Sequence, residues 1–79
     1  MIETEGFSEW LRHNTEYTAP VIKDMVSRVK RADKILVWSD EEVYQFYLDH
    51  EKAYTLLSVS VRSQIRRAVK LYREYRISK

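Results

Sequence analysis

The stretch SVRSQIRRAVKLYREYR, residues 60–76, decides the fold of this chain, because its apolar residues recur with the period of an α-helix. The positions that this period turns inward are Val61, Ile65, Ala68, Val69, Tyr72 and Tyr75. Five arginines and one lysine occupy other positions of the same stretch. Ser58 or Ser60 is a suitable N-cap, since a serine hydroxyl can accept from the free N–H groups of the first turn. The stretch therefore predicts a long amphipathic helix whose exposed side is basic.

Two further helices are expected before residue 38. The first spans about residues 5–13, where Phe7, Trp10 and Leu11 share one face at i, i+3, i+4 spacing. The second begins after Thr18 as N-cap, with Pro20 in a first turn where its missing N–H costs nothing, and lasts until about residue 37. Its apolar stripe consists of Ile22, Met25, Val26, Val29, Ala32 and Leu36.

A third helix is predicted to begin at the segment WSDEEV, residues 38–43. Ser39 and Glu42 form a capping-box pattern, and the carboxylates of Asp40 and Glu41 suit the positive end of a helix. The inner stripe of this helix is predicted to be Val43, Phe46, Tyr47 and His50. The stretch between residues 49 and 54 is ambiguous, because it fits either a frayed continuation or a separate turn.

Composition favours an all-α protein of one domain. One glycine and one proline in 79 residues are too few for the tight turns of a β domain. The length supports a single domain over residues 1–79 with one small core. The expected fold class is therefore all-α, a compact bundle of four helices.

Several kinds of chemistry are disfavoured by what the sequence lacks. Without cysteine there is no disulfide or thiolate metal site, which fits a cytoplasmic location. His13 and His50 lie too far apart in sequence to form a metal-binding pair, and a single glycine allows no glycine-rich phosphate loop. No apolar run approaches the roughly 18 residues of a membrane span. We therefore expect no metal, no cofactor, no small-molecule substrate and no membrane insertion.

Charge is distributed unevenly along the chain. Residues 1–21 carry a net −3, residues 22–38 carry +3, residues 39–57 carry −4 and residues 58–79 carry +6, which sum to the +2 of the whole chain. Two basic helices thus alternate with two acidic ones. In the last helix Arg62, Arg66, Lys70 and Arg73 fall within an arc of roughly 80°, with Arg67 outside it. In the second helix Lys23, Ser27, Lys30 and Lys34 fall in a similar arc, with Arg31 at its edge.

These basic stripes have two interpretations. Stripes of this kind attract phosphates by counterion release, and arginine adds a bidentate geometry that suits phosphate oxygens or guanine. Small helical bundles also carry lysine and arginine on faces that are merely solvated. Residue pattern alone leaves both open.

Four segments resemble, in this order, the N-terminal core-binding, SAM-like domain of tyrosine recombinases and phage integrases. They are FSEWLR (7–12), TAPVIKDMVSRVKRADKIL (18–36), DEEVYQFYLD (40–49) and LSVSVRSQIRRAVKLYREY (57–75), so the resemblance covers nearly the whole chain. Phe7, Trp10 and Leu11 stand at the first motif of that family. Thr18, Val21, Ile22 and Arg28 stand at its second motif, with Met25 where an aromatic residue is usual. The last motif is matched by Leu57, Ser58, Ser60, Val61, Ile65, Ala68, Leu71, Tyr72 and Tyr75. The resemblance implies a four-helix SAM-like bundle whose second and fourth helices face duplex DNA.

Recombinase catalysis is not expected of this chain. The family's catalytic domain needs an H-x-x-R box, but His13 is followed at the third position by Glu16 and His50 by Ala53. Tyr72 and Tyr75 lie on the inward face of their helix and are not expected to act as nucleophiles. What the resemblance leaves is a DNA-binding module without enzymatic activity.

The favoured function is therefore a non-catalytic module from a phage or mobile element that binds double-stranded DNA through its second and fourth helices. The residues expected to hold phosphates are Lys23, Lys30, Arg31, Lys34, Arg62, Arg66, Arg67, Lys70 and Arg73. Those expected near base edges are Ser60, Ser63 and Gln64.

Other functions remain open at this point. A small phage or mobile-element protein could instead bind and inhibit or redirect a host protein, through its acidic third helix and exposed aromatic residues. A self-associating structural subunit is a further alternative. A helix lying on a membrane surface is disfavoured, because a four-helix core would already bury the apolar faces.

Overall fold

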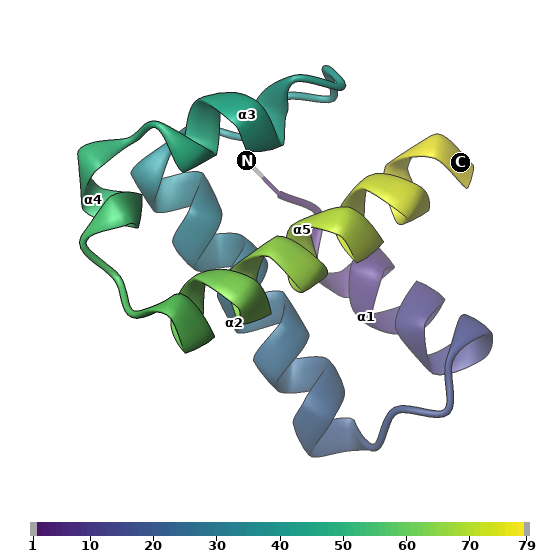
Figure 1. The fold of residues 1–79 in the computed structure, drawn as a ribbon. Coiled ribbons are helices and arrows are strands. Elements are labelled where there is room, and N and C mark those ends of the chain that lie inside the picture. The colour runs from purple at the N-terminus through teal and green to yellow at the C-terminus, as the bar shows by residue number, and fades with distance from the viewer. Residues whose placement is uncertain (1, 79) are drawn as a thin grey trace.

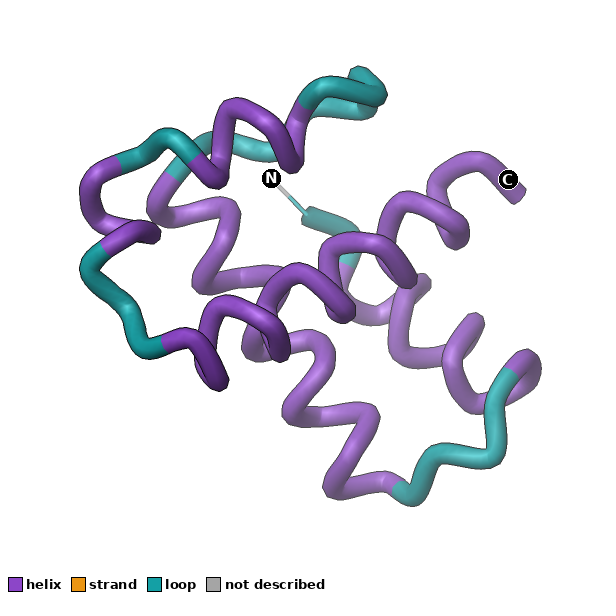
Figure 2. The backbone as a smooth tube through the Cα atoms, viewed as in Figure 1, coloured by secondary structure: helices purple, strands orange, loops and turns teal. Residues whose placement is uncertain are grey.

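The structure is a computed structural model that describes residues 2–78. It places five helices along this part of the chain and no strand (Figures 1 and 2). They are α1 (Thr4–Asn14), α2 (Ala19–Ile35), α3 (Tyr44–Asp49), α4 (Lys52–Thr55) and α5 (Val59–Ser78). The all-α prediction is confirmed. The expected number of helices was one too low, because the ambiguous stretch after α3 forms the separate single turn α4 instead of a frayed continuation.

Helices α2 and α5 form the centre of the fold and cross each other, while α1 packs beside both (Figure 1). The short helices α3 and α4 lie at the other side of the α2–α5 pair and connect the end of α2 to the start of α5. The radius of gyration is 12.0 Å, which matches the roughly 12 Å expected of a compact domain of this length. The two long helices α2 and α5 therefore form the centre of the fold and also carry its basic stripes.

The buried stripe of α5 agrees with the helical period of its sequence. Ile65, Ala68, Val69, Tyr72 and Tyr75 are buried, and Val61 is half-buried. At the start of the helix the N–H of Val61 donates to the Ser58 hydroxyl at 3.2 Å. Of the two serines considered, Ser58 is therefore the cap, and Ser60 lies within the first turn.

Helix α2 ends two residues earlier than its apolar pattern predicts, and Asp33 shows why. The Asp33 carboxylate accepts from the backbone N–H of Trp38 at 2.8 Å, which holds the chain in a turn away from the helix axis. Leu36 is already extended, with φ −144° and ψ 117°. Asp33, an acidic residue on the apolar side of α2, thus stabilises the end of the helix.

Two groups of buried side chains fill the interior, and Trp38 packs against both. One group joins α1 to α2 and α5 and includes Phe7, Leu11 and Tyr72; the other lies beneath α3 and α4 and includes Leu48 and Tyr54. The centroid of the Trp38 ring lies 4.7 Å from that of the Tyr72 ring and 4.7 Å from that of the Tyr44 ring. The segment that connects α2 to α3 is therefore part of the core.

The predicted inner face of α3 was wrong. The buried residues of this helix are Tyr44 and Leu48, whereas Val43, Phe46 and Tyr47 are 44%, 60% and 55% exposed. The capping box does not form, because the Ser39 hydroxyl accepts from the N–H of Glu41 in a turn that precedes the helix. The helix therefore begins at Tyr44, and the Trp38–Tyr44 contact turns the other face of the helix inward.

Candidate nucleic-acid interface

A basic hollow lies on the exposed side of α5. Its volume is about 470 Å³, and its lining residues are Val59, Arg62, Ser63, Arg66, Arg67 and Lys70. Four of these six residues are cations and none carries a carboxylate. We call this set the α5 basic surface. Helical spacing accounts for it, because Arg62, Arg66 and Lys70 follow one another at i, i+4 and i+8 and so share one side of the helix.

Side chains around the hollow orient two of its arginines. An Nη of Arg66 donates to the Asp49 carboxylate at 3.0 Å, and this neighbouring negative charge raises the pKa of Arg66. An Nη of Arg67 donates to the Tyr17 hydroxyl at 2.9 Å. Lys70 forms no ion pair within residues 2–78. The surface thus combines one paired arginine with cations that are available to an anionic ligand.

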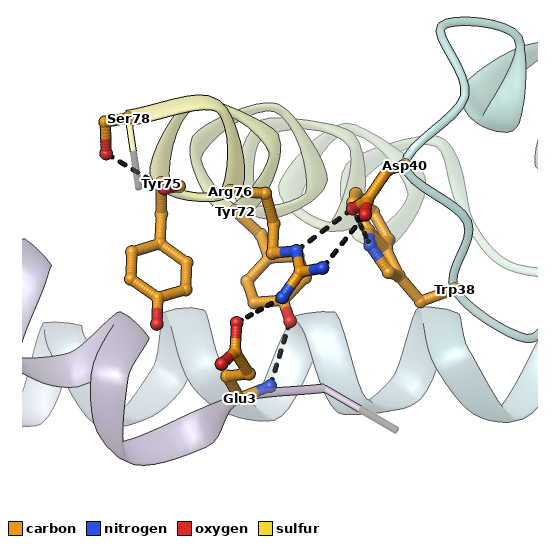
Figure 3. A network of polar contacts seen from close by, with 7 residues as sticks. All are labelled: Glu3, Trp38, Asp40, Tyr72, Tyr75, Arg76 and Ser78. Carbon is orange, nitrogen blue, oxygen red and sulfur yellow. Dashed lines mark hydrogen bonds and ion pairs between the residues drawn. The ribbon is translucent and has the colours of Figure 1, made fainter.

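Arg73 and Arg76 do not belong to the α5 basic surface. Arg73 lies 3.8 Å from the Glu42 carboxylate and lines a cleft beside α3 that shares Arg66 and Lys70 with the hollow. Arg76 connects α5 to the segment before α3 and to the segment before α1, as Figure 3 shows. Its Nε and one Nη donate to the two Asp40 oxygens at 3.0 and 2.9 Å, and its other Nη pairs with Glu3. The hydrogen bonds from Arg76 and then from Trp38 lower the pKa of Asp40 to about 2. Arg76 therefore has a structural role.

The cations of α2 are separate from those of α5. Lys30 and Lys34 line a hollow of about 710 Å³ together with Arg31 and Thr4, and Lys23 and Lys30 line another of about 400 Å³ beside α1. Neither of these two hollows is lined by a cation of the α5 basic surface. The lysines lie roughly 140° around α2 from the centre of its buried stripe. The sequence predicted both stripes, but the structure opens the α2 stripe toward α1 and not toward α5.

The three residues expected near base edges are all exposed, but only one of them lines the hollow of the α5 basic surface. That residue is Ser63. Ser60 and Gln64 lie about 20° and 60° around α5 from Arg67, outside the hollow.

Sequence reasoning missed two features of the surface. The first is the exposed outer face of α3, where the Phe46 ring lies 4.5 Å from the His50 ring and 5.8 Å from the Tyr47 ring. The second is the cleft beside α3 that Arg73 lines. Both follow from the rotation of α3, and the pairing of Trp38 with Tyr44 that causes the rotation has no signal in the local sequence.

Among residues 2–78 no group of three or more histidine, aspartate or glutamate side chains is arranged to hold a metal ion. None of the helices described is long and apolar enough to cross a membrane.

Comparisons of the chain with protein-family models, with curated proteins and with solved structures gave no match. The resemblance to integrase core-binding domains therefore stays a prediction from sequence motifs.

Proposed function

We propose that this chain is a non-catalytic module that binds duplex DNA, with the α5 basic surface as its principal contact. The observation that carries the proposal is the hollow on α5, lined by four cations and by no carboxylate. The resemblance to the core-binding domain of phage integrases supports the same helix as a DNA contact. The cations of α2 line separate hollows and serve as the comparison surface.

The spacing of the cations favours a long polyanion over a small anion. Arg62, Arg66 and Lys70 extend along about 12 Å of helix, at 1.5 Å per residue. Over a similar length one DNA strand carries several phosphates, since successive phosphates rise about 3.4 Å along the helix axis. A single phosphate could contact only part of the surface. Neutralising several DNA phosphates releases condensed counterions, which provides the free energy of binding.

A salt titration with two matched variants tests this proposal. Fluorescence anisotropy would follow a labelled duplex of about 20 base pairs at several salt concentrations. One variant carries glutamine at the exposed positions Arg66, Arg67 and Lys70; the control carries glutamine at Lys23, Lys30 and Lys34. Each variant loses three positive charges, so a general effect of net charge is the same in both.

We expect the wild-type affinity to fall steeply with salt. The α5 variant should bind more weakly, with a log–log slope shallower by about two to three units, because each lost phosphate contact removes nearly one unit. The α2 control should keep most of the slope. Equal losses in the two variants, or no binding at low salt, would refute the assignment of DNA binding to α5.

The outer face of α3 favours a second candidate function, the binding of a protein partner. Phe46 and Tyr47 are 60% and 55% exposed and adjoin each other on an acidic segment of the chain. Exposed aromatic residues of this kind are enriched in protein interfaces. Affinity capture at moderate salt should then retain a protein that is lost with the Phe46→Ser/Tyr47→Ser variant. Identical captured proteins for the two forms would exclude this face as the interface.

A further inference from the structure

A cleft lies between α5 and the segment that runs from the end of α2 into α3. Its volume is about 220 Å³, and its lining residues are Trp38, Glu41, Tyr44, Gln45, Arg66, Val69, Lys70 and Arg73. We call it the α3–α5 cleft. Pockets for drug-sized ligands measure roughly 300–1,000 Å³, so this one suits a single small ring system.

The inner part of the cleft offers aromatic and apolar surface. Tyr44 and Val69 are buried and Trp38 is half-buried. The Trp38 Nε1–H already donates to Asp40 at 2.8 Å, and the Tyr44 hydroxyl donates to the Leu36 carbonyl at 2.6 Å. Because both polar groups are used within the protein, the part of the Trp38 ring that stays exposed presents mainly carbon atoms to an occupant, above the buried Tyr44.

The rim of the cleft is charged. Arg66, Lys70 and Arg73 provide three cations, and Glu41 provides the one carboxylate among the lining residues. Glu41 is exposed and forms no ion pair within residues 2–78. A ligand that matches this arrangement has a flat ring, an anionic group attached to it, and an N–H donor on the ring.

The cleft is continuous with the proposed DNA contact. Arg66 and Lys70 line both the α3–α5 cleft and the hollow of the α5 basic surface. A phosphate held between these two residues would therefore stand at the entrance of the cleft, and the base attached to the same nucleotide could reach into it.

We propose that the α3–α5 cleft takes one unpaired nucleobase of DNA whose phosphate is bound by Arg66 and Lys70, so that the protein prefers duplexes carrying an unpaired nucleotide. This inference rests on the proposed DNA-binding function. The exposed part of the Trp38 ring packs against the base, as aromatic residues do in single-strand binding sites, and the buried Tyr44 and Val69 form the floor of the cleft. Glu41 accepts from an exocyclic amino group, which cytosine and adenine carry and thymine lacks.

The test compares three duplexes of identical sequence by fluorescence anisotropy. One is blunt, one carries a single unpaired cytidine nucleotide at a 3′ end, and one carries an abasic nucleotide in the same place. The last two have the same charge, so the phosphate contribution cancels between them. We expect the cytosine-bearing overhang to bind about tenfold more tightly than the abasic one, which is the size of effect that stacking on an aromatic side chain produces.

Replacing one of two glutamines by tryptophan gives the variant and its matched control. Gln45→Trp fills the cleft, whereas Gln64→Trp places the same side chain on an exposed position of α5 outside it. The preference for the cytosine overhang should disappear in the first and persist in the second. If Gln45→Trp lowers the helix content, Glu41→Ala at an exposed position replaces it, and a fourth duplex carries an unpaired thymidine nucleotide in the same place. The wild type should prefer cytosine over thymine, and Glu41→Ala, which removes the acceptor, should not.

The outcomes separate this inference from the function on which it rests. Blunt duplex bound by the wild type, with equal affinity for the cytosine and abasic overhangs, overturns the nucleobase site and leaves duplex binding intact. Failure of the wild type to bind any of the three duplexes overturns the proposed function, and the inference falls with it.

Discussion

Replacing Gly6 by alanine should destabilise the protein through one specific contact. A Cβ built on Gly6 would overlap the Tyr75 hydroxyl and would lie 3.0 Å from Tyr75 Cζ. The Tyr75 ring has little freedom to withdraw, because it is 7% exposed and packs 5.8 Å from the Phe7 ring and 6.2 Å from the Trp10 ring. The close approach of α1 to α5 at this point therefore depends on glycine.

The expected magnitude follows from two opposing effects. Overpacking of a core by one methyl group costs roughly 1–3 kcal/mol. Alanine recovers about 1 kcal/mol relative to glycine in a helix interior, and less at Gly6, which lies in the first turn of α1. The net loss in the free energy of unfolding should be about 1 kcal/mol, although a helix-propensity scale alone predicts a gain.

A double-mutant cycle isolates the contact. The free energies of unfolding by urea would be measured for the wild type, Gly6→Ala, Tyr75→Phe and the double variant. Removal of the hydroxyl makes room for the new methyl group, so the double variant should be more stable than the sum of the single effects predicts, by about 1 kcal/mol. A Gly6→Ala variant at least as stable as the wild type, or additivity within about 0.5 kcal/mol, would refute the contact.

Three further predictions concern the interior and the Arg76 cluster. Asp40 has a folded-state pKa of about 2 against an ordinary 3.8, so its ion pair with Arg76 stabilises the fold above pH 4, and this stabilisation is lost as the pH falls toward 2. Because Asp40 is exposed, we expect the ion pair to contribute about 1 kcal/mol or less to the free energy of unfolding. The urea midpoints at pH 5 and pH 2.5 should therefore differ less in Asp40→Asn than in the wild type. Leu48→Ala should cost about 2–4 kcal/mol in urea unfolding and Phe46→Ala less than about 1, because the first side chain is 0% and the second 60% exposed; the reverse order would mean that α3 is misplaced. Tyr54→Phe should cost about 1 kcal/mol by the same measurement, since the Tyr54 hydroxyl donates to a carbonyl of α5 at 2.9 Å, and an unchanged stability would exclude that bond.

The buried faces of the long helices could be predicted from the sequence, and the buried face of the short helix α3 could not. Helix α5 has 20 residues, so its apolar positions repeat over more than five turns and only one face can be buried. Helix α3 has six residues, which make less than two turns. Two different faces satisfy helical spacing over this length: one with Val43, Phe46 and Tyr47, and one with Tyr44 and Leu48. The choice between the faces is made by the contact with Trp38, which is tertiary.

The same distinction applies to the candidate site. The cations of α5 could be found on a helical wheel, because their relative positions are fixed within one helix. The ion-pair partners of the α5 arginines could not be found in this way. Carboxylates of residues 40–49 lie beside Arg66, Arg73 and Arg76, and the helical period does not tell how this segment folds back on α5. The separation of the α2 stripe from the α5 basic surface also depends on the packing of three helices.

The ion pair between Arg66 and Asp49 means that the protein carries its own competitor for a phosphate. A phosphate at Arg66 must share the guanidinium with the Asp49 carboxylate, which also accepts from the Gln45 amide at 2.8 Å and so connects Arg66 to α3. Repulsion between the two anions offsets part of the free energy that Arg66 gains from the phosphate. Arg66 should therefore add less to the affinity for DNA than a cation of the same surface that has no carboxylate beside it.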